Sequence, residues 1–430
     1  MKAQVRQTSV ETVRPHGNLR WGIAFFLLLF AIINNFDRSN LSIANPLISK
    51  QFHLGPAAMG VLLSAFLWPY AISNLVAGWM VDRTTPRRML AAATGSWSLV
   101  SLLTGFANSF GFFYFMRVLL GIAESPFFSV GIKIIDRWFP KKERATAASI
   151  YNAGGPVANA IAPPLLTALM LSLGWQGMFM VLGVTGLVLT GVWLAFYRDP
   201  THKKHITPEE YAYISTESKE KDENNNTKKT SWGSLFKYRS TWAMIVGNMG
   251  IGYVFWTYLT WLPGYLEQAR HLSILKTGWM ASIPFLAGII GVPLGGAISD
   301  YFLRNGYKPI VARKIIILTS AILTAVAVAP VAYVSNLTLC MVLLSVGFFA
   351  SSLQPGVVWT LATDVAPSDR VASLGAIQNF GGYIGATAAP IVTGLIVQNT
   401  HTFNLVFIVG AILCVVAALS YGFFLREPIK

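Results

Sequence analysis

Residues 152–163 read NAGGPVANAIAP, and residues 379–390 read NFGGYIGATAAP. Each stretch begins with an asparagine and reaches paired glycines and then a proline at the same spacing. A second matching pair, GWMVD at 78–82 and GAISD at 296–300, precedes these stretches in the same order. Two matches in corresponding positions predict two duplicated halves, a construction found in many membrane carriers.

The composition excludes a soluble protein. Apolar residues make up 54% of the 430 residues, and charged residues only 12%. A soluble domain carries about 25% charged residues, so this deficit predicts a chain that lies in a lipid bilayer. The net charge of +15 lies in short segments between apolar runs, as expected for membrane topology, and does not indicate a nucleic-acid-binding surface.

The apolar runs predict an all-α membrane protein with twelve transmembrane helices in two six-helix halves. A spanning helix needs about 20 mostly apolar residues. The first half contains such runs at roughly 20–48, 57–81, 89–110, 112–136, 145–171 and 174–197. The second half contains them at roughly 241–266, 274–298, 310–333, 336–361, 371–398 and 403–425.

These runs divide the chain into domains. We expect an amino-terminal cytoplasmic tail (1–19), a first bundle (20–197), a polar cytoplasmic linker (198–240), a second bundle (241–425) and a short cytoplasmic tail (426–430). Lysine and arginine concentrate in the first tail, the linker and the alternate loops. Because positive loops stay inside, we expect both termini in the cytoplasm and a multi-pass protein of a bacterial-type cytoplasmic (inner) membrane.

Four charged residues lie inside the expected helices. Asp37 and Arg38 belong to the first helix, and Arg117 and Glu124 to the fourth. Each costs a few kcal/mol at the bilayer centre, so each should face a partner or a water-filled cavity. Asp37 and Arg117 lie at comparable depths, so we expect them to pair. Glu124 lies two turns deeper on the same face, and only folding could bring a basic neighbour to it.

These groups favour transport of an anion coupled to protons. Desolvation favours the protonated form of a carboxylate, and a nearby arginine opposes it, so Asp37 and Glu124 are candidate proton sites with Arg117 as the partner of Asp37. Arginine stays charged, so Arg38 or Arg117 offers a permanent bidentate clamp for a carboxylate. A static interhelical ion pair is the alternative interpretation.

Polar and aromatic residues inside the helices complete a candidate substrate cavity. Amide and hydroxyl groups could bind a polyol, and aromatic faces could cover a sugar or an aromatic ring. Each of them could instead pack between helices or anchor the chain at the membrane interface. The candidates are Asn35, Tyr70, Asn152, Tyr258, Trp359, Asn379 and Tyr383.

The sequence lacks the residue patterns that disulfide frameworks, metal sites, nucleotide binding and hydrolysis require. Cys340 and Cys414 lie in apolar runs, and the six histidines lie outside them, so we expect neither a disulfide framework nor a metal site. The sequence contains no phosphate-binding loop of the type G-x-x-x-x-G-K-[ST] and no hydrolase motif. We therefore expect no cofactor and no enzyme.

The loop that follows Gly78 resembles the signature loop of the major facilitator superfamily, with Thr85 and Pro86 where glycine and arginine are usual. The fourth-helix stretch RVLLGIAE (117–124) resembles another signature of that superfamily. The resemblance implies a gating role for the residues of this loop and its counterpart in the second half. These residues are Gly78, Asp82, Arg83, Arg87, Gly296 and Asp300.

Three further motifs resemble the anion:cation symporter family, and sugar-acid carriers of the galactonate type most of all. They are NFDRSNLS (35–42), WFP-x-x-ER (138–144) and TWLPGYL (260–266). The resemblance implies proton symport, with Asp37 and Glu124 as proton sites and Arg38 and Tyr70 as substrate contacts. Asn35, Gly155 and Tyr383 depart from residues found in such carriers, which indicates a substrate other than galactonate.

We therefore expect a monomeric importer of a small organic anion, a hexonate, hexuronate or aldarate, that works by alternating access. A carrier of aromatic or other simple carboxylates is the first alternative. A proton-driven exporter is the second, although its cavity would more often lack an arginine clamp. A membrane enzyme or sensor would need a catalytic constellation or an output domain, and the segment 198–240 is too short and too polar for either.

Overall fold

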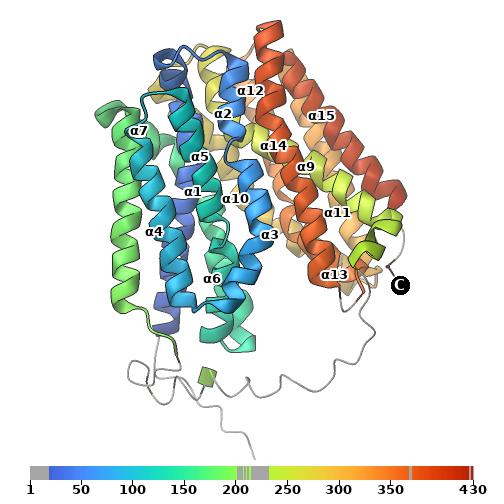
Figure 1. Cartoon of the computed structure of the whole chain (residues 1–430). Coiled ribbons are helices and arrows are strands. Elements are labelled where there is room, and N and C mark those ends of the chain that lie inside the picture. The colour runs from blue at the N-terminus through green and yellow to red at the C-terminus, as the bar shows by residue number, and fades with distance from the viewer. Residues whose placement is uncertain are drawn as a thin grey trace, which may run out of the picture.

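The computed structural model describes residues 19–200, 207, 210, 213–214, 232–367, 370–425 and 428–429. Within these ranges the chain folds into helices and forms no strand. Most of the expected tails 1–19 and 426–430 and most of the expected linker 198–240 lie outside the described residues. The prediction of an all-α membrane fold is confirmed (Figure 1).

The first half contains six membrane crossings. Prolines at the first helical position start α2 and α4, and the Ser109 side chain caps α5. The helices are α1 (Leu19–Gln51), α2 (Pro56–Ser64), α3 (Leu67–Arg83), α4 (Pro86–Thr104), α5 (Phe110–Glu124), α6 (Phe127–Trp138) and α7 (Lys141–Phe196). Helices α2 and α3 form the second crossing, and α5 and α6 form the fourth.

Helix α7 holds the fifth and sixth crossings. The chain reverses at Gly174, whose φ of 72° lies in the left-handed region that only glycine adopts without strain. By length and hydropathy alone, nine helical segments of the described residues can cross a membrane, α7 counted once. Helices α4 and α9, which pack on α7 and α14, supply the remaining two crossings.

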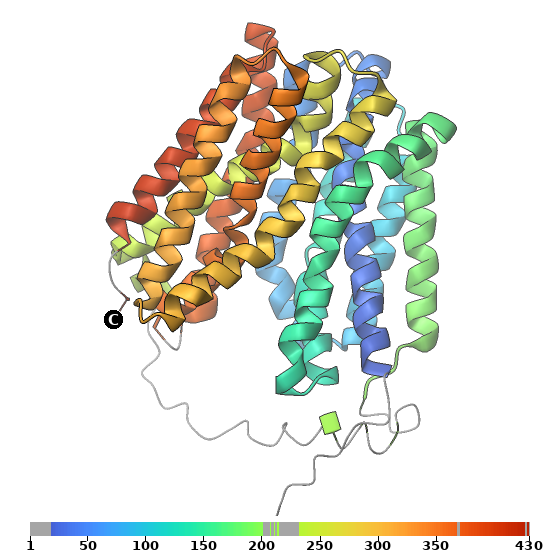
Figure 2. The ribbon, with the colours of Figure 1, turned by 180° about the vertical axis from the view of Figure 1, so that it is seen from behind.

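The second half repeats this plan. It consists of η3 (Trp232–Lys237), α9 (Arg239–Gln268), α10 (Ile274–Arg304), α11 (Pro309–Val328) with η4 (Ala329–Ala332), α12 (Leu337–Ser352), α13 (Pro355–Val365), α14 (Val371–Thr400) and α15 (Asn404–Leu419) with the π-helical turn η5 (Ser420–Phe424). Helices α12 and α13 form the tenth crossing, broken at the same point of the repeat as α5 and α6. The two halves lie side by side (Figures 1 and 2).

The halves meet closely at the end of the molecule where α2 begins and α14 ends (Figure 1). We call this the closed end, and the end where α1 begins and α7 finishes the linker end. A Cβ atom on Gly60 would lie 2.3 Å from the Pro390 carbonyl oxygen, and one on Gly278 would lie 3.1 Å from that of Pro163. Glycine therefore permits the two backbones to touch at this seam.

A hydrogen bond joins the halves at the same end. The backbone N–H of Ala57, on α2, donates to Gln398 Oε1, on α14, at 3.1 Å. Nearer the middle of the molecule, Ser42 Oγ on α1 donates to the Thr260 carbonyl oxygen on α9 at 2.8 Å. The halves are thus held together by backbone contact and one hydrogen bond at the closed end, and by a second hydrogen bond nearer the middle.

Candidate functional site

Arg38 and Glu124 form a buried ion pair between α1 and α5. Arg38 Nε donates to Glu124 Oε2 at 2.9 Å, and the two side chains are 8% and 0% exposed. Removing one partner of such a pair typically costs about 3–5 kcal/mol, because the other charge stays buried. The sequence offers Glu124 a basic neighbour only through folding, and folding brings Arg38 against it.

Aromatic rings surround the Arg38 guanidinium. Its Cζ lies 4.8 Å from the centroid of the Tyr70 ring and 5.2 Å from that of Phe66, within cation–π range. The Tyr70 ring lies 5.2 Å from the ring of Tyr383 on α14. Four residues predicted from the sequence, Arg38, Glu124, Tyr70 and Tyr383, thus gather where the two halves meet.

Asp37 precedes Arg38 on α1, and its side chain is fully buried. Its Oδ1 accepts hydrogen bonds from Ser101 Oγ on α4 and from Asn40 Nδ2, the latter at 3.3 Å. Arg117 Nη1 donates to the Asp37 backbone oxygen at 3.0 Å and to Asn40 Oδ1 at 3.2 Å.

Arg117 and Asp37 are neighbours, as their depths predicted. Among the residues that the structure describes, however, no direct ion pair joins their side chains. Asn40 lies one turn after Asp37, and its amide donates to the carboxylate and accepts from the arginine. The expected direct pair is therefore an amide-bridged one.

A cavity of about 260 Å³ opens in the second half beside this cluster. Three predicted substrate residues line it, namely Trp359, Asn379 and Tyr383. Its other walls include Asn248, Gly252, Phe255, Trp256, Ser351, Gln378 and Gly382. Aromatic faces with a few convergent amides and hydroxyls are typical of a site for a small polar molecule.

Sequence reasoning missed three of these residues: Asn248, Trp256 and Gln378. Asn248 Nδ2 donates to the Gln378 carbonyl oxygen at 2.8 Å, which fixes α9 to α14 beside the cavity. A Cβ on Gly382 would lie 2.6 Å from that same nitrogen. The repeated paired glycines were the available signal, because they mark a helix surface against which a polar side chain lies closely.

Other predicted substrate residues lie elsewhere. Tyr258 is 5% exposed and donates its hydroxyl to the Leu344 carbonyl oxygen at 3.0 Å, lining a separate apolar cavity. The Asn35 amide donates to the Ala31 carbonyl oxygen of its own helix at 2.8 Å and faces Gly155. Asn152 is exposed on α7.

The predicted gating residues lie at the linker end, where the halves differ. In the first half Arg83 stacks on Trp79 at 4.3 Å, and Arg87 donates to the Leu194 carbonyl oxygen. The Lys133 ammonium on α6 donates to three carbonyl oxygens at the end of α3, those of Val81, Asp82 and Thr84. Gly78 and Gly296 have open space beside them.

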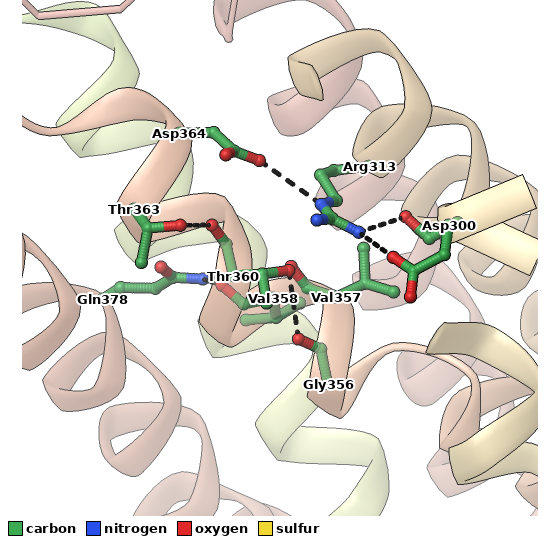
Figure 3. A network of polar contacts seen from close by, with 10 residues as sticks. Asp300, Arg313, Gly356, Val357, Val358, Thr360, Thr363, Asp364 and Gln378 are labelled. Atoms are coloured by element: carbon green, nitrogen blue, oxygen red, sulfur yellow. Dashed lines mark hydrogen bonds and ion pairs between the residues drawn. The ribbon is translucent and has the colours of Figure 1, made fainter. Parts of the chain in front are cut away.

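In the second half an arginine lies between two carboxylates (Figure 3). Arg313 on α11 contacts Asp300 of α10 at 3.4 Å and Asp364 of α13 at 3.3 Å. Its Nη1 also donates to Ser299 Oγ at 2.7 Å. The Arg313 guanidinium thus connects three crossings, those that contain α10, α11 and α13.

Comparison with known proteins gives relatives along nearly the whole chain. The sequence profile of the Major Facilitator Superfamily matches residues 27–312 and 278–430. A probable L-galactonate transporter of Escherichia coli strain K12 is 38% identical over 408 residues, covering 95% of this chain and 90% of the relative. A probable galactarate/D-glucarate transporter of the same strain is 32% identical over 430 residues, covering 96% of each.

A solved structure shows the same fold. The crystal structure of a bacterial homolog to the human lysosomal transporter Spinster, in an inward-facing and occupied conformation, matches with a TM-score of 0.78. It covers 96% of this chain and 98% of that one at 16% sequence identity.

Proposed function

The chain belongs to the Major Facilitator Superfamily, and we propose that this membrane transporter imports a sugar acid together with protons. The observation that carries the proposal is the Arg38–Glu124 ion pair, buried beside a polar, aromatic cavity at the junction of the halves. The chain's relatives include transporters named for galactonate, galactarate and D-glucarate.

Proton binding and substrate binding are linked through Arg38. While Glu124 is ionised, it accepts from Arg38 Nε and neutralises the guanidinium. Protonation of Glu124 leaves Arg38 without a counter-charge in a dry site, which is costly. A substrate carboxylate can then take the place of Glu124, with the bidentate geometry that arginine favours.

Asp37 supplies the second proton site. Its carboxylate is held by Ser101 and Asn40, and Asn40 in turn is held by Arg117. Protonating Asp37 removes the charge to which Asn40 donates and loosens the connection between α1 and α5. Arg117 thereby senses the protonation of Asp37 through an amide.

The cavity fits the rest of a sugar acid. Asn248, Gln378 and Asn379 offer amide groups for hydroxyls, and Trp256 and Trp359 offer faces for the apolar side of the carbon chain. Arg38 lies on the other half, so a substrate that contacts both sides connects the halves. This is what alternating access requires of a midplane site.

In the membrane orientation that we propose, the closed end faces the outside. The basic loops lie at the linker end, so the positive-inside rule places the linker end in the cytoplasm, with both termini. The conformation is then inward-facing. We assign the bundles to 20–197 and 241–425 in a bacterial inner membrane, working as a monomer.

Uptake into proteoliposomes tests the proposal. An inward proton gradient is imposed with and without protonophore, and labelled hexonates, hexuronates, aldarates and hydroxybenzoates are offered. Gradient-dependent accumulation of one sugar acid supports it. Uptake of a hydroxybenzoate alone would replace the substrate class, and sugar-acid uptake that ignores the protonophore would refute proton coupling.

A further inference from the structure

The two buried carboxylates each have one oxygen bound and one oxygen unpartnered. Asp37 Oδ1 accepts from Ser101 and Asn40, and Glu124 Oε2 accepts from Arg38. Within the described part of the chain, Asp37 Oδ2 and Glu124 Oε1 are buried without a hydrogen-bond partner. Both side chains are 0% exposed, so each oxygen leaves a hydrogen-bonding requirement unmet.

Asn34, on α1, is a neighbour of both carboxylates. It precedes Asp37 by three residues, and helical residues so spaced are neighbours on one face. Its amide lies beside the Glu124 carboxylate. Asn34 is 0% exposed, and neither its Oδ1 nor its Nδ2 has a hydrogen-bond partner among the described residues.

We propose that Asn34 is a positioning residue that connects Asp37 and Glu124 for proton transfer, an inference that rests on the proposed proton symport. A proton leaves Oδ2 of protonated Asp37 and binds Oε1 of ionised Glu124. No other bond changes, and the negative charge moves to Asp37. The amide suits both states, because Nδ2 donates to a carboxylate and Oδ1 accepts from a carboxylic acid.

The other polar groups around the two carboxylates do not offer a competing route for the proton. The charged groups that face the two carboxylates are Arg38 on α1 and Arg117 on α5, both of which remain protonated. Tyrosines approach from three other helices, Tyr70 on α3, Tyr151 on α7 and Tyr383 on α14. From α4, Ser101 holds the oxygen of Asp37 that the transfer does not use.

The variant Asn34→Leu tests the inference, because leucine keeps the volume and removes both polar atoms. Two rates are compared for it: proton-driven uptake, and counterflow exchange of labelled sugar acid at equal pH. Counterflow returns the carrier with its protons bound, so it does not need the transfer. We expect proton-driven uptake to fall about 100-fold, the low end of what positioned proton transfer contributes, with counterflow unchanged.

Two further variants make the result decisive. Asn45→Leu alters another buried asparagine of α1 whose Nδ2 is also unpartnered, and we expect it to keep the wild-type ratio of the two rates. Asn34→Ser restores a donor and an acceptor and should recover most of the uptake. We also expect the pH profile of uptake to change in Asn34→Leu alone.

The outcomes separate this inference from the proposed function. Wild-type uptake that ignores the proton gradient overturns the proposed function. Coupled wild-type uptake with an unchanged ratio in Asn34→Leu overturns the inference alone. Loss of counterflow in both Asn34→Leu and Asn34→Ser also overturns it, because it would assign Asn34 to folding or to substrate binding.

Discussion

The seam between the halves makes a quantitative prediction for Gly60→Ala. The added Cβ would lie 2.3 Å from the Pro390 carbonyl oxygen, whereas ordinary contact begins at 3.4 Å. Helices α2 and α14 must therefore separate by about 1.1 Å, the difference between these two distances. The opposing atom is backbone, so it cannot turn aside as a side chain would.

The strain acts only while the closed end is closed. Overpacking of this kind typically costs about 1–3 kcal/mol, which multiplies the ratio of open to closed molecules by about 5–150. Thr167 reports on the seam, because it is 2% exposed and its Oγ1 would lie 2.5 Å from a Cβ on Gly278. We expect a membrane-impermeant thiol reagent to label Thr167→Cys faster in the Gly60→Ala background by that factor.

Gly111→Ala is the matched control, since a Cβ at Gly111 would meet nothing within 4 Å. The native cysteines, Cys340 and Cys414, are buried and should contribute a low background. An unchanged labelling rate in Gly60→Ala, or an equal rise in Gly111→Ala, would refute the reasoning.

Three more predictions follow from the site and its supports. Arg38→Lys keeps the charge but loses the planar fork, so we expect the KM for a sugar acid to rise about tenfold, equivalent to about 1.4 kcal/mol; an unchanged KM would remove Arg38 from substrate binding. Glu124→Gln keeps shape but cannot ionise, so uptake should lose its dependence on the proton gradient while counterflow continues, and retained gradient dependence would contradict its role. Lys133→Met removes three hydrogen bonds at the end of α3 and should lower stability by about 1–2 kcal/mol, seen as a lower melting temperature, with Lys276→Met as a control.

The number of crossings could be predicted from the sequence, because twenty apolar residues in a row have few other solutions. The breaks within crossings could not. Ser125 and Pro126 interrupt the fourth crossing, yet a proline inside a membrane helix can also produce only a kink. The expected helix over 112–136 is therefore two helices in the structure.

The partners of the buried charges were harder to predict than their presence. Asp37 and Arg38 are adjacent, so their side chains point about 100° apart around α1. Which of the two faces Glu124 depends on the rotation of α1 against α5, and hydropathy does not encode this rotation when polar residues occupy much of the helix. The depth estimate placed Asp37 beside Arg117 but could not reveal Asn40 between them.

The seam also bears on how such a chain could arise. Gly60 touches Pro390, and Gly278 approaches Pro163, with the two prolines at matching ends of the repeated stretches. The contact is therefore made twice, with the roles of the halves exchanged. This is the geometry of an isologous interface. A six-helix ancestor that paired with its own copy would have formed both contacts at once, before a gene fusion joined the copies into one polypeptide.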